Sequence, residues 1–101
     1  MAKIRVNVDV DDNGNVNVTQ SPRVKELKVN EDTIVFTSNR SDTAIKFKGF
    51  PLAEMNGRQI LELPARTTFK VVRGKIHFDC GHLVGKTFRK WGETGADIPP
   101  C

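Results

Sequence analysis

Apolar and polar side chains alternate along most of the chain, beginning close to its N-terminus. In the segment "KIRVNVDV" (3–10) every second residue from Ile4 to Val10 is apolar, which predicts a half-buried β-strand. The dipeptide Asn13-Gly14 favours the positive φ angles of a tight turn, and "VNVT" (16–19) then resumes the alternation. The sequence therefore predicts an N-terminal β-hairpin.

The same kind of pattern recurs at short intervals after Ser21-Pro22. Further strands are expected at "VKELKV" (24–29), "TIVFTS" (33–38) and "TAIKFK" (43–48), with three more within residues 58–79, separated at Pro64-Ala65 and at Arg73-Gly74. Only "FPLAEMNG" (50–57) has the character of a helical turn, and segment 92–101, rich in Gly and Pro, is expected to be an irregular tail.

Short strands with closely spaced turns are typical of antiparallel sandwiches and small barrels. We therefore expect one all-β domain over residues 1–101, an antiparallel Greek-key β-sandwich of about seven to nine strands. The period-two rule predicts an inward-facing set that comprises Val6, Val8, Val16, Val18, Leu27, Val29, Ile34, Phe36, Ile45, Phe47, Leu61, Leu63, Phe69, Val71, Ile76, Phe78 and Leu83.

Length and composition agree with one compact domain: 101 residues, of which 38% are hydrophobic and 28% charged. The apolar runs are far shorter than the ~20 residues of a membrane helix, and the N-terminus has no apolar signal core. We expect no membrane association and a cytoplasmic location for the chain as it stands, or a periplasmic or secreted one if a signal peptide was removed. Cys80 and Cys101 are too few for a disulfide scaffold, and their redox state is left open.

The net charge of +4 is unevenly distributed. Residues 40–90 carry eleven basic and four acidic side chains, a net charge of +7. A basic middle segment is compatible with anionic partners, although basic residues on solvated strand faces more often serve solubility.

Two blocks, "VKELKVNEDTIVFTSNRSDTAIKFKG" and "TTFKVVRGKIHFDCGH", resemble the cupredoxin-type β-sandwich of blue-copper proteins. The resemblance implies that fold, with a copper ion held by two histidines, one cysteine thiolate and a weak axial ligand that is often methionine. Cys80 and His82 match the cysteine and the second histidine. The first histidine would lie around Asp42 to Ile45, where the chain has none, and no methionine follows His82, so the ligand set is incomplete.

The run "HFDCGH" (77–82) is the main candidate for metal chemistry, because thiolate and imidazole suit copper and zinc. Its ligands would be Cys80, His82 and His77, with Cys101 a further option. In the simpler alternative Cys80 is a buried strand residue in line with Ile76 and Phe78. Alternation places His77 on the opposite face of that strand, as it does Asp79.

Two other segments have partial motifs. Asp9, Asp11, Asn13 and Gly14 match the first half of a calcium loop, but Gln20 stands where a bidentate glutamate is needed, and a tight hairpin turn favours the same residue types. Residues Lys86, Phe88, Arg89, Lys90 and Trp91 could bind single-stranded nucleic acid on a barrel-like sheet. The whole chain has seven aromatic residues, and Phe88 and Trp91 are more simply core and lid residues, so nucleic acid is not expected as the partner.

Catalysis has little support, because no oxyanion loop or orienting residue accompanies the pair Cys80 and His82. The leading hypothesis is a small non-enzymatic β-sandwich that acts as a binding or structural module. We expect it to have no cofactor, to bind a protein partner of unknown kind and to be monomeric or weakly self-associating. One alternative is a metal-binding or electron-transfer relative of the cupredoxins that uses Cys80 and His82 with copper or zinc, and another is a single-stranded nucleic-acid-binding β-barrel.

Overall fold

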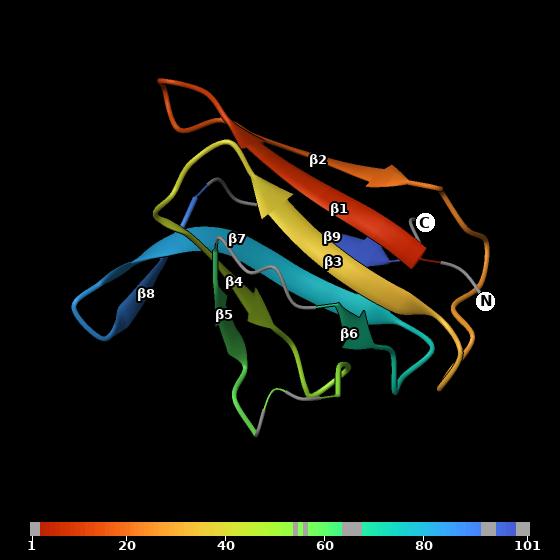
Figure 1. Ribbon diagram of the computed structural model, residues 1–101. Coiled ribbons are helices and arrows are strands. Elements are labelled where there is room, and N and C mark those ends of the chain that lie inside the picture. The colour runs from red at the N-terminus through yellow and green to blue at the C-terminus, as the bar shows by residue number, and fades with distance from the viewer. Residues whose placement is uncertain (1–2, 54, 56, 64–67, 92–94, 99–101) are drawn as a thin grey trace.

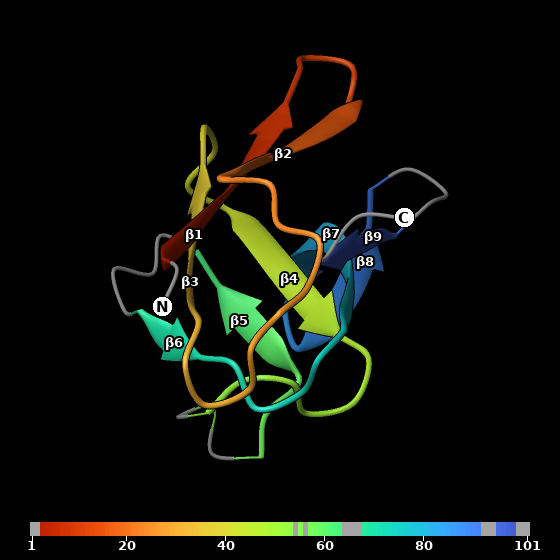
Figure 2. The same ribbon diagram turned by 90° about the vertical axis from the view of Figure 1, so that its right-hand side faces the viewer.

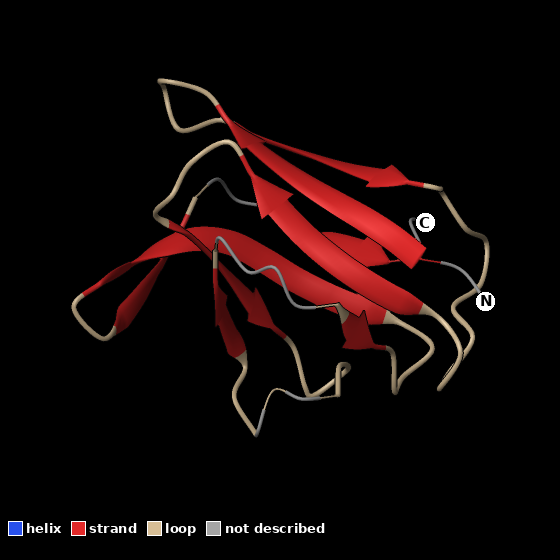
Figure 3. Ribbon diagram, in the orientation of Figure 1, coloured by secondary structure: helices blue, strands red, loops and turns tan. Residues whose placement is uncertain are grey.

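Two β-sheets packed face to face make up the fold (Figure 1). The computed structural model describes residues 3–53, 55, 57–63, 68–91 and 95–98. These residues form strands, turns and loops and no helix, as Figure 3 shows, so the prediction of an all-β chain is confirmed. Accordingly, nothing in these ranges has the length and apolar character of a membrane-spanning helix.

Nine strands lie within the described residues. They are β1 (Lys3–Val10), β2 (Val16–Ser21), β3 (Thr33–Ser38), β4 (Thr43–Phe47), β5 (Ile60–Glu62), β6 (Phe69–Lys70), β7 (Ile76–Val84), β8 (Thr87–Lys90) and β9 (Ala96–Ile98). The first sheet has the order β2-β1-β3-β6, and the second has the order β5-β4-β7-β8, with β9 also paired to β7.

The first sheet begins with the expected hairpin of β1 and β2, in which Val8 lies opposite Val18. Gly14 has a φ of 81°, and the Asp11 carboxylate accepts hydrogen bonds from the amides of Asn13 and Asn15, so the turn forms where the sequence predicted it. Strand β3 then pairs with the other edge of β1 in parallel. The prediction of antiparallel pairing is therefore wrong at this pair.

The parallel pair explains why segment 24–29 is not the strand that we predicted. The chain leaves β2 on one side of β1 and must cross to the other side before β3 begins, so this segment serves as a crossover (Figure 2). Leu27 is buried within the core, whereas Val29, which was expected to face inward, is 45% exposed. Buried Asp32 accepts a hydrogen bond from the amide of Lys28 at 2.8 Å and closes the turn before β3.

The second sheet is built around β7, which pairs with β4 along one edge and with β8 and β9 along the other. Ile45 lies opposite Cys80, and Phe47 lies opposite Phe78, so these four side chains share the inner face of the sheet. The rings of Phe47 and Phe78 approach that of Phe36 from β3 at centroid distances of 5.5 and 5.6 Å. These edge-to-face contacts join the two sheets at the centre of the core.

Most of the predicted inward-facing set is buried, with exceptions that follow from the strand geometry. Leu83 has the same parity along β7 as Asp79 and lies on the outer face, so its assignment to the core was wrong. Val16, Val18 and Leu61 are only partly buried against the core. Core residues missing from that set are Ile4, Val10, Ala44, Leu52, Met55 and Ile98.

Two segments that were expected to contain no strand also pair with the sheets. Leu52 forms an isolated bridge with Val71, and the described part of segment 50–57 contains a turn, closed by a hydrogen bond from the amide of Arg58 to the carbonyl of Met55. The expected irregular tail contains β9, whose Ile98 is fully buried. The remainder of that tail, 92–94 and 99–101, lies outside the described residues.

Candidate functional site

The three residues predicted to bind metal all lie on β7, but on different faces. Cys80 and His82 occupy inward positions of the strand, opposite Ile45 and Thr43 of β4. His77 is opposite Asp97 of β9 on the outer face. The strand is regular through this stretch, so the structure brings Cys80 and His82 to one side of the sheet and places His77 on the other.

His77 has a partner of its own. Its Nδ1 forms a short contact with the Oδ1 atom of Asp97, the residue that faces it on β9. The side chain of His77 is 44% exposed, so this pair belongs to the solvent-facing surface of the second sheet.

His82 is stacked on an aromatic ring. Its ring and that of Trp91 have a centroid distance of 5.1 Å and an interplanar angle of 20°. The amide of Trp91 donates a hydrogen bond to the carbonyl of Cys80, which holds the indole beside β7. On the indole lies the guanidinium of Arg40, 4.9 Å from the ring centroid. Nδ1 of His82 is buried without a hydrogen-bond partner among the described residues.

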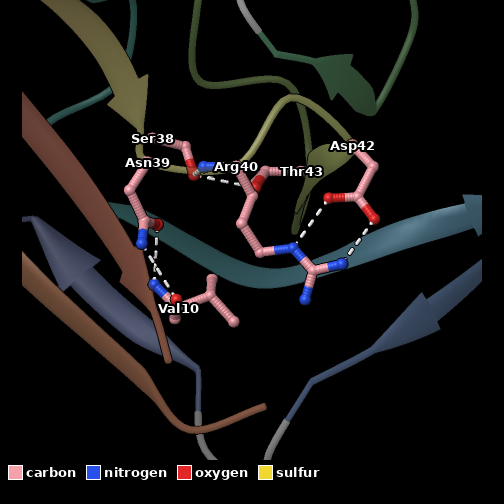
Figure 4. A network of polar contacts seen from close by, with 6 residues as sticks. All are labelled: Val10, Ser38, Asn39, Arg40, Asp42 and Thr43. Carbon is pink, nitrogen blue, oxygen red and sulfur yellow. Dashed lines mark hydrogen bonds and ion pairs between the residues drawn. The ribbon is translucent and has the colours of Figure 1, made fainter. Parts of the chain in front are cut away.

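The loop between β3 and β4 holds Arg40 in this position (Figure 4). The side chain of Asn39 accepts a hydrogen bond from the amide of Val10 and donates one to its carbonyl, at 2.8 and 2.9 Å. Arg40 donates two hydrogen bonds to the carboxylate of Asp42. This interaction lowers the pKa of Asp42, which therefore remains ionised and paired at neutral pH.

The position that the cupredoxin resemblance assigns to a first histidine lies in the same region. Thr43, directly opposite His82, is almost completely buried. Its hydroxyl is 2.7 Å from that of Ser38, so the two side chains share a hydrogen bond. At this position the chain has a hydroxyl in place of an imidazole, and the described residues include no group of three His, Cys, Asp or Glu side chains placed to hold one metal ion.

Cys80 is 5% exposed and lies among the apolar side chains of the core. Burial raises the pKa of its thiol to about 12, and the negative charge of Asp79 adds to the effect. Because the thiolate is the metal ligand and the nucleophile, binding of copper or zinc would first have to remove a tightly held proton.

We expect Cys80 to react as a buried, protonated thiol. In a Cys101→Ser background, where Cys80 is the only thiol, alkylation by iodoacetamide at pH 8 should be about a thousandfold slower in the native state than in guanidinium chloride, because the thiolate fraction falls about tenfold per pKa unit.

The raised pKa of Cys80 also makes the stability of the fold depend on pH. Because the folded state holds the thiol proton more tightly than the unfolded state, this proton contributes stability that is complete below about pH 9 and is lost as the pH rises towards 12. The free energy of unfolding should therefore decrease in that range.

Cys80→Ser is the matching variant, since its hydroxyl does not titrate there. It should cost about 1–3 kcal/mol at pH 7, the penalty for a hydroxyl in an apolar site, and should make the decrease at alkaline pH smaller. A bound metal would also protect the thiol from alkylation, so the metal content of both proteins must be measured. Stoichiometric copper or zinc that is lost in Cys80→Ser would contradict the buried-thiol interpretation.

The segment with a partial calcium motif forms the turn of the β1–β2 hairpin. The Asp11 carboxylate accepts hydrogen bonds from the amides of Asn13 and Asn15 and from the side chain of Asn15. These bonds, chiefly that from the Asn15 amide, lower the pKa of Asp11. The carboxylate thus stabilises the turn directly, which accounts for Asp11 and Asn15 without calcium.

A hollow of about 750 Å³ lies on the outer face of the second sheet. It is lined by residues of β4, β5 and β7, of the segment before β5 and of the β7–β8 turn: Lys46, Arg58, Gln59, Ile60, Glu62, Leu83 and Lys86. Ile60 and Leu83 provide its apolar part. Its lining carries three positive charges, those of Lys46, Arg58 and Lys86, and one negative charge, that of Glu62. None of the three cations forms an ion pair with a described carboxylate.

The aromatic ring of Phe88 lies on the same face of the sheet. Phe88 is opposite Leu83 in the β7–β8 ladder, and the Nζ of Lys46 is 6.0 Å from the centroid of its ring. Alternation along β8 places the residues of the basic segment 86–91 on different faces of the sheet. Phe88 and Lys90 share the outer face, whereas Trp91 stacks on His82. Phe88 is therefore a partly buried surface residue and not part of the core.

Comparison with models of known protein families, with curated proteins and with solved structures finds no match. The cupredoxin resemblance and the Greek-key detail of the fold therefore stay predictions. What can be inferred about function depends on the arrangement of the side chains.

The sequence interpretation missed Lys46, Arg58, Ile60 and Glu62 as members of one surface. A signal was present in the net charge of +7 over residues 40–90. A second signal was parity, because Lys46 lies between Ile45 and Phe47, which face the core, and so must face outward. Neither signal indicates which strands are neighbours, and only the pairing of β4 with β5 and β7 brings these residues together.

Proposed function

We propose that the protein is a non-enzymatic binding module that binds an anionic, partly apolar ligand on the outer face of the second sheet. The observation that carries this proposal is the hollow whose lining combines the cations Lys46, Arg58 and Lys86 with the apolar Ile60 and Leu83. Its size is within the range of ordinary ligand sites, about 300–1,000 Å³.

The charge of this surface supports an anionic ligand. A cation whose charge is compensated by a neighbouring carboxylate contributes little to the field, as with Arg40, which is paired with Asp42. Lys46, Arg58 and Lys86 have no such partner among the described carboxylates. Their summed potential attracts anions and would increase the rate of association.

Among the described residues, the lining of this hollow supports binding better than catalysis. The buried thiol of Cys80 belongs to the inner face of the sheet, and the pKa of about 12 keeps it protonated. The hollow itself is lined by amines, a guanidinium, an amide, one carboxylate and aliphatic side chains. Such a set is suited to recognition by charge and apolar contact.

A heparin hexasaccharide is a convenient polyanionic probe for this proposal. On titration into ¹⁵N-labelled protein, we expect amide shifts to concentrate around Lys46, Ile60 and Leu83, which line the hollow. Lys46→Glu should weaken binding about tenfold or more, because it reverses a charge close to the bound anion. Arg5→Glu is the matched control, since Arg5 is exposed on the outward-facing side of β1 in the other sheet.

Equal effects of Lys46→Glu and Arg5→Glu, with shifts spread over both sheets, would show binding by net charge alone and would contradict a defined site. Absence of binding at low salt would contradict the proposal as well.

A further inference from the structure

We propose that the ligand of this surface is single-stranded nucleic acid, with phosphates at Lys46, Arg58 and Lys86 and a base on the ring of Phe88. This inference rests on the proposed function, specifies its ligand class and departs from the sequence-based expectation that nucleic acid is not the partner. Proteins that bind single strands without strong sequence preference combine a basic groove with aromatic rings on which bases stack.

The position of Phe88 is the first argument. At Gly81, on the neighbouring strand, a Cβ atom would be 2.8 Å from the Cζ of Phe88, so the ring extends across the glycine and lies against the sheet. The missing side chain at Gly81 is what allows this ring position. A partly exposed ring held against a rigid sheet is a suitable stacking surface for a base.

The second argument is the cation next to the ring. The Nζ of Lys46 is 6.0 Å from the ring centroid of Phe88, and Lys46 also lines the hollow. A phosphate at Lys46 and a base on Phe88 would thus be close together, as the two parts of one nucleotide are. An acidic polypeptide would use the cations but would gain little from the aromatic ring.

The third argument is the extent of the surface. A second hollow of about 350 Å³ is lined by Lys46, Lys48, Gln59 and His77 and by one carboxylate, that of Asp79, and it shares Lys46 and Gln59 with the first. The two hollows therefore adjoin each other at Lys46 and Gln59. Together they exceed what one small anion would occupy and offer room for more than one nucleotide of a flexible single strand.

The test uses fluorescence anisotropy with a labelled decathymidylate at several salt concentrations. Phe88→Leu should weaken its binding about tenfold, within the range of one lost base stack, while heparin binding changes less than twofold. Lys46→Gln should reduce the slope of log K against log salt by about 0.7, the value for one lost phosphate contact with a single strand. Arg5→Gln, which removes the same charge from the other sheet, should leave the slope unchanged.

An abasic decamer provides a test that needs no variant, and wild-type protein should bind it about tenfold more weakly than decathymidylate. Equal affinity for the two decamers, or for decathymidylate and octaglutamate, would overturn the assignment to nucleic acid, as would equal affinity for a ten-base-pair duplex. If heparin binds at this surface and decathymidylate does not, only the ligand class is wrong. If neither binds, the proposed function fails as well.

Discussion

Val8→Asp is expected to abolish cooperative folding. Val8 is fully buried on β1, between Val18 of β2 and Ser38 of β3. An aspartate there would place an unpaired carboxylate in the core, at a cost of several kcal/mol. A domain of this size has only about 5–15 kcal/mol of stability in total, so urea denaturation followed by circular dichroism should show no native baseline.

Asn7→Asp is the neighbouring control. Asn7 lies on the opposite face of β1, where its Oδ1 accepts a hydrogen bond from the hydroxyl of Thr37 at 2.9 Å. An aspartate keeps that acceptor and remains partly solvated, so we expect a change below about 1 kcal/mol in the free energy of unfolding. Comparable losses in the two variants would mean that the register of β1 is wrong.

Gly81→Ala is expected to produce the second large effect. A Cβ atom at this position would be 2.1 Å from the carbonyl oxygen of Arg89 and 2.8 Å from Phe88. Since that oxygen belongs to the backbone of β8, the strand would have to move away from β7. We expect a loss of about 3 kcal/mol, the upper part of the usual range for overpacking, measured by urea denaturation.

Gly74→Ala is the matched glycine variant. No atom lies within 4 Å of the Cβ atom that it would add, and Gly74 is not among the glycines with a positive φ. Its free energy of unfolding should remain within about 0.5 kcal/mol of the wild-type value. If Gly81→Ala proved as stable as Gly74→Ala, the close contact of β7 with β8 would be disproved.

Much of the fold could be predicted because alternation is a local property. In β1 every second residue from Ile4 to Val10 is apolar and buried, and the same spacing holds for Ile34 and Phe36 in β3 and for Ile45 and Phe47 in β4. The prediction of a strand at 24–29 is wrong, and the apolar residues of this segment, Val24, Leu27 and Val29, do not alternate strictly. Val24 and Leu27 instead attach a crossover to the core, and Val29 faces solvent.

The candidate site was less predictable. Proximity of Cys80 and His82 in sequence suggested a metal site, and period-two geometry does place both on the inner side of β7. The surroundings determine their chemistry: burial keeps the Cys80 thiol protonated, and Trp91 covers the ring of His82. The prediction that Leu83 faces the core is wrong: it is half-buried on the outer face, and a single apolar side chain on the surface is common in proteins.

The sequence by itself determined the all-β class, the first hairpin and the face on which most strand residues lie, because these follow from residue spacing and turn chemistry within a few positions. Only the tertiary structure decided which strands are neighbours. Lys46, Arg58 and Lys86 are far apart along the chain and meet because β4 lies between β5 and β7 and because β8 folds back on β7. Strand order depends on how the apolar faces of distant segments pack together, and local alternation does not specify it.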